Sequence, residues 1–240
     1  MKWLPVALMA SLSACVTAKQ HQSVENRVAS LEAQLTALED RLAPLLPPSL
    51  EEQKASEQLF DDAMTAIQDL RWDDAKGKLG EVLAKYPNTQ AAQAAQSMAS
   101  ELAVVGRDAL PLEVDQWFQG SEADLTDDKA TLYVFWEAWC PHCRREVPRL
   151  SETYDRFRDK GLGLVGLTEM TRDVSPEDVA TFIEDNDVTY PIAKEKAQAL
   201  SKQYGIRGIP AAAMVRDGKV VWRGHPATLT DALIERVLMP

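Results

Sequence analysis

A chain of 240 residues is long enough for one or two domains with a sizeable core. Hydrophobic residues make up 45% and charged residues 26%, so the composition excludes a wholly disordered chain. The 26 Lys and Arg residues against 37 Asp and Glu give a net charge of -11, which argues against a nucleic-acid partner, because binding nucleic acid requires a basic surface. Three cysteines are too few for a disulfide-stapled scaffold, and they divide into Cys15 alone and the pair Cys140 and Cys143.

Residues 1–15 have the features of an export signal. Lys2 precedes an apolar run of about ten residues, which is shorter than the ~18–20 residues that span a bilayer. The run ends in Leu12-Ser13-Ala14-Cys15, which resembles a bacterial lipobox and implies that Cys15 is lipidated and becomes the mature N-terminus. The alternative is a soluble secreted protein in which Cys15 falls near the cleavage site by chance.

The lipobox resemblance implies a place in the cell envelope. Each buried methylene of an acyl chain contributes roughly 0.8 kcal/mol, so a multiply acylated Cys15 anchors the chain to a membrane. We expect the anchored chain to face the periplasm, and Val16 after the cysteine favours the outer membrane in a Gram-negative cell. Outside the cytosol, thiols can be oxidised.

Residues 16–48 are predicted to form a linker and a coiled-coil helix that ends at Pro44, Pro47 and Pro48. Apolar residues recur there at alternating spacings of four and three: Val24, Val28, Leu31, Leu35, Leu38, Leu42 and Leu45. Such a narrow stripe favours a parallel coiled coil that makes a homo-oligomer. The alternative is a lone amphipathic helix that lies on the rest of its own chain.

Residues 49–108 are predicted to form a small all-α module. Ser49 and Glu52 make a capping box at the start of its first helix, and Tyr86-Pro87 ends the second. An Ala-rich segment at about 89–105 is predicted to form a third helix. Residues 51–105 resemble a tetratricopeptide repeat in their order of aromatic, Ala, Leu and Tyr-Pro positions. A plain helical spacer is the alternative.

Residues 112–240 alternate strands with helices, which predicts an α/β domain with helices on both faces of its sheet. Strands are expected at 131–135, 162–167, 211–215 and 220–223, and helices at 141–160, 175–186, 194–204 and 229–238. Asp217-Gly218 between the last two strands is a hairpin turn signal.

Cys140-Pro141-His142-Cys143 lies where the first expected strand of this domain leads into a helix. A zinc site needs a second ligand pair and a haem attachment site needs His after the second cysteine; neither is present, so a redox dithiol remains. Pro141 starts the helix and puts the two cysteines one turn apart. The helix N-terminus and a protonated His142 favour a thiolate at Cys140, whereas Cys143 is expected to be shielded.

The segment Phe135-Trp136-Glu137-Ala138-Trp139-Cys140-Pro141-His142-Cys143 resembles the FWxxWCxxC motif of the thioredoxin superfamily, and residues 204–210 resemble the segment that carries its cis-proline. The resemblance covers residues 112–240 and implies a thioredoxin fold. It also implies that Cys140 is the attacking cysteine, Cys143 the resolving one and Pro210 the cis residue beside them. Trp139, Pro141, His142 and Ile209 are then neighbours of the active site.

The chain departs from thioredoxin at the buried acidic residue that precedes the motif, where Val134 stands. Glu169 instead aligns with an acidic residue of the membrane-anchored periplasmic TlpA/ResA-like members, and we expect it to accept the proton of Cys143; the alternative is a side chain that faces solvent. Glu137 is the second candidate; the alternative is that it points outward into solvent. Trp136 is expected to pack in the core and Trp139 to form the rim of the groove.

The resemblance implies a membrane-anchored thiol–disulfide oxidoreductase that acts on thiols or disulfides of envelope proteins. It would need a membrane or periplasmic redox partner, and no metal or cofactor beyond the Cys140–Cys143 disulfide. The Pro-His dipeptide is that of the oxidising DsbA-like branch, whereas the overall layout resembles TlpA-like reductases, so the direction stays open. A peroxidase of the superfamily would carry Thr-x-x-Cys, which is absent. The alternative function is an envelope scaffold that uses the coiled coil and helices, with the thioredoxin domain as a docking platform.

Overall fold

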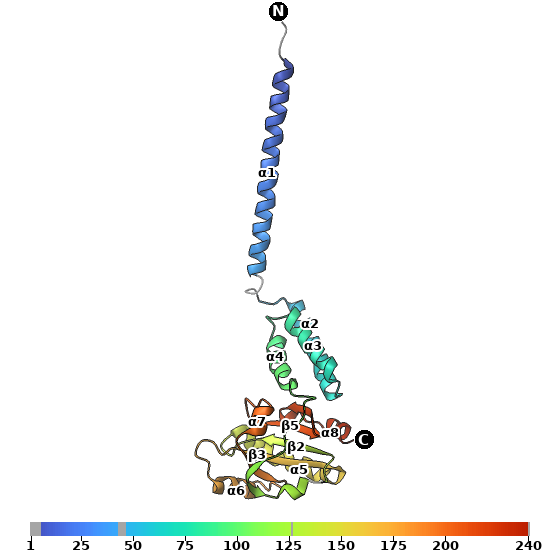
Figure 1. Ribbon diagram of the computed structural model, residues 1–240, viewed down its shortest axis with the longest axis vertical. Helices are drawn as coiled ribbons and strands as arrows, with labels where there is room; N and C mark the ends of the chain where they lie inside the picture. Colours follow the sequence, from blue (N-terminus) through green and yellow to red (C-terminus); the bar gives the residue numbers. More distant parts are fainter. Residues whose placement is uncertain (1–5, 43–46, 126, 240) are drawn as a thin grey trace, which may run out of the picture. The chain divides into compact units, whose positions relative to one another are not determined.

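The computed structural model describes residues 6–42, 47–125 and 127–239, with the backbone alone for residues 6–19 and 39–41. It divides into two compact units, residues 1–49 and residues 50–240. Figure 1 shows helix α1 (Val6–Leu42) in the first unit and all other helices and strands in the second. None of the helices within the described ranges combines the length and the hydropathy of a membrane span.

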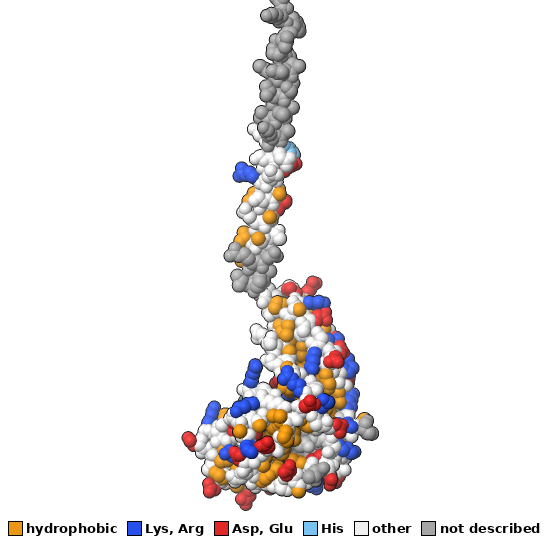
Figure 2. All heavy atoms as spheres, viewed as in Figure 1, with side chains coloured by type: hydrophobic (Ala, Val, Ile, Leu, Met, Phe, Trp, Pro, Cys, Tyr) orange, Lys and Arg blue, Asp and Glu red, His pale blue; other side chains and the backbone are white. Residues whose placement is uncertain are grey.

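Helix α1 includes the predicted heptad region and presents its apolar stripe to solvent (Figure 2). Six stripe residues are between 47% and 62% exposed: Val24, Val28, Leu31, Leu35, Leu38 and Leu42. The predicted helix is therefore present, and the coiled coil stays a prediction. Leu45 and the side chain of Cys15 lie outside the described residues, and so does the start of the export signal.

The all-α module consists of α2 (Leu50–Gln68), α3 (Trp72–Lys85) and α4 (Gln90–Leu102). Thr89 begins α4, because its Oγ1 accepts the N–H of Ala92 at 3.2 Å. Small side chains let the three helices approach closely around one core, which includes Ala63, Ala66, Ala75, Leu79, Val82, Ala92, Ala95 and Leu102. Three helices were predicted here, and the likeness to a tetratricopeptide repeat stays a prediction.

The rest of the second unit is built on a mixed sheet of six strands in the order β1-β4-β3-β2-β5-β6. The strands are β1 (Val114–Gln119), β2 (Ala130–Phe135), β3 (Leu162–Thr168), β4 (Ile192–Glu195), β5 (Ala211–Arg216) and β6 (Lys219–Gly224). Strands β2, β3 and β4 are parallel, and the other pairs are antiparallel. Every residue of β3 is buried, as expected for a strand covered on both faces.

Helices α5 (Pro141–Phe157), α6 (Pro176–Asp185) and α8 (Asp231–Leu238) share one core with the sheet, and α7 (Ala199–Gln203) belongs to a core that includes Tyr133 and Phe135 of β2. Because Tyr133 and Phe135 alternate with Leu132 and Val134 of the first core, the two cores lie on opposite faces of the sheet. This arrangement is the thioredoxin-like fold expected from the sequence.

One predicted helix differs from the structure, and one strand was not predicted. The helix expected at 194–204 is wrong over its first part, because residues 192–195 form strand β4 and α7 begins only at Ala199. The carboxylate of Glu195 accepts the N–H of Ser201 at 2.8 Å, which ties the strand end to the short helix. Strand β1 was not predicted, and it pairs with β4 along its length.

The all-α module is joined to the sheet through main-chain hydrogen bonds. The N–H of Gly106 donates to the carbonyl of Val220 at 2.8 Å, and the N–H of Val220 donates to the carbonyl of Arg107 at 2.9 Å. The segment after α4 therefore continues the sheet beyond strand β6. Trp72 packs against both the module core and the core under α5.

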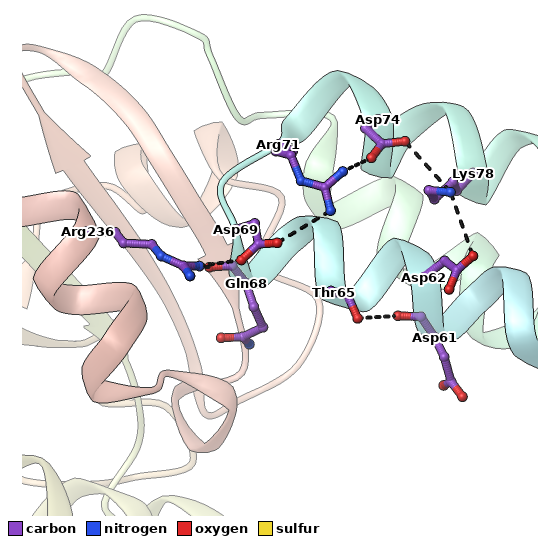
Figure 3. Close-up of polar contacts among 9 residues, drawn as sticks. All are labelled: Asp61, Asp62, Thr65, Gln68, Asp69, Arg71, Asp74, Lys78 and Arg236. Carbon is purple, nitrogen blue, oxygen red and sulfur yellow. Dashed lines mark hydrogen bonds and ion pairs between the residues drawn. The ribbon is translucent and has the colours of Figure 1, made fainter.

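A polar network holds the module from a second side (Figure 3). Asp69, at the end of α2, accepts from Arg236 of α8 at 2.6 Å and pairs with Arg71 at 3.4 Å. Thr230 also donates to the side-chain carbonyl of Gln68 at 2.9 Å. The segments 49–108 and 112–240 expected from the sequence are therefore packed together in one unit.

Candidate active site

Cys140 is the N-cap residue of α5, and Pro141 is the first residue of the helix. Its extended backbone, with φ -80° and ψ 118°, places the sulfur at the end of the helix where unpaired N–H groups favour negative charge. The Sγ atom donates to the carbonyl oxygen of Ile209 at 3.7 Å. The sulfur is thus held between a helix N-terminus and the loop that precedes β5.

Cys143 lies one turn further along α5 and is 0% exposed. Both cysteines of this pair are free thiols. Burial raises the pKa of Cys143 to about 12, a shift that a hydrogen bond from the backbone of Glu137 opposes and that the nearby charge of Glu137 adds to. Because so few molecules carry a Cys143 thiolate near neutral pH, a neighbouring group that takes the proton would accelerate its reaction.

Glu137 is a buried carboxylate in the loop between β2 and α5, only 5% exposed. Its oxygens accept from the N–H groups of Glu169 and Thr171 at 3.2 and 3.3 Å, and from Oγ1 of Thr168 at 3.2 Å. Burial raises the pKa of Glu137, and these hydrogen bonds oppose the shift. The outward orientation considered for Glu137 is therefore wrong: the side chain points inward and links the ends of β2 and β3.

Glu169 follows β3 and has a different environment. Its side chain is partly exposed and accepts a hydrogen bond from the side-chain amide of Gln198. Its backbone N–H, not its carboxylate, contacts Glu137. The role of Glu169 as proton acceptor stays a prediction, and Glu137, the second candidate, is the buried carboxylate whose charge acts on Cys143.

The peptide bond between Ile209 and Pro210 is cis, as the thioredoxin resemblance implied. A cavity of about 240 Å³ opens beside this loop. Its lining includes Glu137, Trp139, Glu169, Arg207 and Ile209. Among the side chains that the structure describes, no group of three or more His, Cys, Asp and Glu is arranged to hold a metal ion.

The two tryptophans of the motif occupy the expected places. Trp136 is buried in the core under α5 and α6, where its ring lies 4.8 Å from that of Phe182. Trp139 is partly exposed at the cavity, and its Nε1 donates to Thr171 at 3.0 Å. The guanidinium of Arg172 lies 3.5 Å from the centroid of the Trp139 ring. Trp139 thus forms the rim of the groove.

His142 is exposed in the first turn of α5, and its Nδ1 accepts from Arg145 at 2.7 Å. Arg145 thus adds a guanidinium to the first turns of α5, beside the ring of His142. Arg144 also lies in this turn, and its guanidinium donates to the carbonyl of Ala138 at 3.2 Å. The signal that could have identified both residues is their position directly after Cys143 in the chain.

The C-terminal part of the chain thus has a thioredoxin-like fold, with a cysteine pair at the start of a helix and a cis-proline in the loop before β5. Residues 105–223 match the family model described as the AhpC/TSA family. This match includes the motif, Glu169 and the loop before β5.

The chain is also similar in sequence to individual bacterial thiol–disulfide oxidoreductases. The chain is 29% identical over 106 residues to the thiol–disulfide oxidoreductase ResA of Bacillus thuringiensis subsp. konkukian, which covers 43% of this chain and 60% of that protein. It is 30% identical over 87 residues to the sporulation thiol–disulfide oxidoreductase A of Bacillus subtilis, over 36% of this chain and 53% of that one. The chain therefore spans about three fifths of the ResA relative.

Among solved structures, the thioredoxin domain of a thiol–disulfide oxidoreductase from Bacteroides vulgatus is 27% identical to the chain, with a TM-score of 0.45. That likeness covers 55% of this chain and 94% of the other. A solution structure of a thioredoxin-like protein in the oxidised form is 22% identical, with a TM-score of 0.47, over 55% of this chain and 95% of the other.

Proposed function

We propose that the protein is a thiol–disulfide oxidoreductase in which Cys140 and Cys143 exchange a disulfide with other proteins. The observation that carries this proposal is the position of the Cys140 sulfur, at the N-cap of α5 and 3.7 Å from the carbonyl of Ile209 beside cis-Pro210. A substrate sulfur that reaches Cys140 meets a helix terminus that favours thiolate and a loop that can hold the substrate chain.

In the reducing direction, the Cys140 thiolate attacks one sulfur of a substrate disulfide, and the other substrate sulfur leaves as a thiolate. The Cys143 thiolate then attacks Cys140 in the mixed disulfide, so the Cys140–Cys143 bond forms and the first substrate sulfur leaves. Two electrons pass from the dithiol to the substrate disulfide. The reverse sequence oxidises a substrate dithiol.

The second step needs the proton of Cys143 to be removed, and Glu137 is the group that we assign to this task. It is buried with Cys143, its pKa is raised by burial, and its charge acts on the Cys143 sulfur. A carboxylate with a raised pKa is a stronger base, which suits it to accept a thiol proton. Glu169 is the alternative acceptor, from its resemblance to the TlpA/ResA-like group.

Two variants test the exchange activity. Cys140→Ser should abolish reduction of insulin and oxidation of a model dithiol, because no attacking thiolate remains. Cys143→Ser should instead accumulate mixed disulfides through Cys140, which non-reducing gels and mass spectrometry detect. Wild-type turnover by the Cys140→Ser protein would refute the proposal.

The redox potential of the Cys140–Cys143 pair determines whether the protein reduces or oxidises its substrates. Equilibration of the dithiol with glutathione redox buffers gives a midpoint potential. A value near that of thioredoxin would indicate a reductase, and a value near that of DsbA an oxidase. Neither outcome removes the exchange activity itself.

We further propose that lipidation of Cys15 anchors the protein at the periplasmic face of an envelope membrane, with the outer membrane favoured in a Gram-negative cell. The lipobox-like Leu12-Ser13-Ala14-Cys15 supports this location. Metabolic labelling with a radioactive fatty acid should mark the full chain and not a Cys15→Ala variant. Labelling that survives the substitution would contradict the anchor. Envelope proteins would then be the substrates, served by a membrane or periplasmic redox partner.

The exposed stripe of α1 favours a second candidate function, an envelope scaffold that oligomerises through a coiled coil. A chain that lacks both thiols separates the two functions. If Cys140→Ser with Cys143→Ser fully restores a deletion strain, the protein serves as a scaffold; if it restores nothing, the dithiol carries the function.

A further inference from the structure

A second cavity, of about 560 Å³, lies on the other side of the loop that precedes β5. Residues 207–209 line both this cavity and the smaller one, and the carbonyl of Ile209 accepts from the Cys140 sulfur. A chain whose sulfur is bonded to Cys140 therefore has residues within reach of the larger cavity. One wall comes from α4 of the all-α module, through Gln96, Ser97, Ser100 and Glu101.

The opposite wall holds a buried cation. Arg223 of β6 is only 4% exposed and lines the cavity. Its Nε donates to the carbonyl of Tyr204 at 3.2 Å, and its Nη1 donates to the carbonyls of Ala212 and Gly224 at 3.4 and 3.0 Å. Its Nη2 makes no hydrogen bond with the residues that the structure describes. These three bonds hold the charged guanidinium in the wall of the cavity.

Two more side chains of the cavity offer donors to an anion, and one of them, Arg207, is a cation. Arg207 is exposed on the loop and forms no ion pair or hydrogen bond within the described parts of the chain. His225 uses Nδ1 to accept the N–H of Ala227 at 3.1 Å, so its Nε2 remains as a donor. Glu101 of the α4 wall is the opposing charge: burial lowers the pKa of Arg223, and the charge of Glu101 counters that shift.

The wall from α4 is fixed in place before any substrate arrives. Main-chain hydrogen bonds join Gly106 and Arg107 to Val220, and the ion pair of Asp69 with Arg236 holds the other end of the module (Figure 3). A preformed cavity costs less ordering on binding than a mobile one, which favours its use as a recognition site.

We propose that this cavity binds a carboxylate near the reacting cysteine of a substrate polypeptide, an acidic side chain that pairs with Arg207 and Arg223. The proposal rests on the thiol–disulfide exchange activity proposed above and names a class of substrate for it. The all-α module is then part of the substrate site, because α4 closes the cavity that selects an acidic substrate.

The test uses the full chain in its reduced form and synthetic peptides that each carry one cysteine as a mixed disulfide with thionitrobenzoate. The Cys140 thiolate attacks the peptide sulfur, the peptide–Cys140 disulfide forms, and thionitrobenzoate leaves and is read by absorbance. One peptide series carries Glu and a matched series Gln, moved one position at a time along either side of the cysteine. At the best position, the Glu peptide should react about threefold to tenfold faster than its Gln partner.

Variants on the two walls should change that ratio in opposite directions. Arg207→Gln should bring it below about twofold, and Glu101→Gln should raise it, because a competing carboxylate is removed. Arg158→Gln, an exposed arginine of the same charge at the far end of α5, is the matched control and should keep the wild-type ratio. Arg223→Lys keeps the charge but loses the fork of donors, and its ratio should fall while thermal unfolding verifies the fold.

Equal rates for Glu and Gln peptides at every position would overturn the carboxylate site, and so would a ratio that Arg158→Gln lowers as much as Arg207→Gln does. Both of these outcomes can be distinguished from the absence of thiol–disulfide exchange activity. In that case the wild-type protein would release thionitrobenzoate from no peptide faster than Cys140→Ser does.

Discussion

Replacement of Glu137 by Gln tests how the buried Cys143 becomes a nucleophile. The substitution keeps the size of the side chain and removes its ability to take a proton. Burial raises the pKa of Cys143 from the usual 9.0 to about 12, so at neutral pH the thiolate is about a thousandfold rarer than in an exposed cysteine. The thiolate of a less acidic thiol is more nucleophilic, and a Brønsted coefficient of about 0.4–0.5 raises its rate constant roughly fifteen- to thirtyfold for this shift.

The net penalty without a base is therefore about thirty- to sixtyfold, and this is the largest decrease we expect for the second step in Glu137→Gln, because the substitution also removes the charge that adds to the raised pKa of Cys143. The step is visible when the reduced protein is mixed rapidly with dithiobisnitrobenzoate. The first thionitrobenzoate reports attack by Cys140, and the second reports the attack of Cys143 on Cys140. In the variant, the rate of the second phase should also rise about tenfold per pH unit across the neutral range, because free hydroxide must then remove the proton.

Matched variants separate this role from a purely structural one. Glu169→Gln should leave the second phase within about twofold of wild type, and Cys143→Ser should show the first phase alone. A second phase in Glu137→Gln with the wild-type rate and pH profile would refute the assignment of Glu137. A large loss in Glu169→Gln instead would transfer the role to Glu169.

Three further predictions concern stability and assembly. Leu79→Ala, at a fully buried position of the module core, should cost about 2–5 kcal/mol of unfolding free energy in urea titrations. Burial and the neighbouring Asp127 raise the pKa of Asp128 to about 6, so the folded state loses stability as the pH rises through that value. Asp128→Asn should remove this loss of unfolding free energy, which is about 1 kcal/mol after solvent screening. Thermal unfolding at pH values below and above 6 measures the difference between the variant and the wild type. Leu31→Asn with Leu38→Asn should convert an oligomer of the full chain to monomer in analytical ultracentrifugation, whereas a wild-type chain that sediments as a monomer would contradict the coiled coil.

The central part of the fold was predictable because its sequence signals are local. Strands β2 and β3 are continuous apolar runs, and Pro141 and Pro176 mark the first residues of α5 and α6. Strand β4 has only four residues, and a run that short does not distinguish a strand from a helix. Strand β1 mixes polar with apolar positions at the edge of the sheet, so its pairing with β4 is a tertiary effect.

The site shows the same division between local and tertiary information. The cysteine pair follows from a motif in which every residue is a chain neighbour. The orientation of Glu137 does not, because its burial depends on donors from residues 168–171, which the fold brings to it from the next strand. The sequence could not identify Arg223 either, for the same reason. In the sequence it is one polar residue of a hairpin strand, and the cavity that it lines forms only when α4 lies opposite.

A shortened chain that begins at residue 112 tests whether the all-α module is separable from the thioredoxin-like part. That truncation removes the main-chain hydrogen bonds of Gly106 and Arg107 to Val220 and that of Ala109 to Gly218, and it removes Val104 from the core around Tyr204. At about 0.5–1.5 kcal/mol for each hydrogen bond and about 1.5–3 kcal/mol for a buried valine, the loss is about 3–7 kcal/mol. Typical domains are stable by only about 5–15 kcal/mol.

The truncation also leaves strand β6 as an open edge, which can pair with another chain. We therefore expect a 112–240 fragment to unfold at lower denaturant concentration than a 50–240 fragment and to scatter more light on storage. Equal unfolding free energies for the two fragments would show that the module contributes nothing to the fold. If the two unfolding free energies differ as expected, the segment after α4 holds strand β6 in place. The same segment then also holds the orientation of the Arg223 guanidinium, because Arg223 lies in β6. Stability and substrate selection then depend on the same junction.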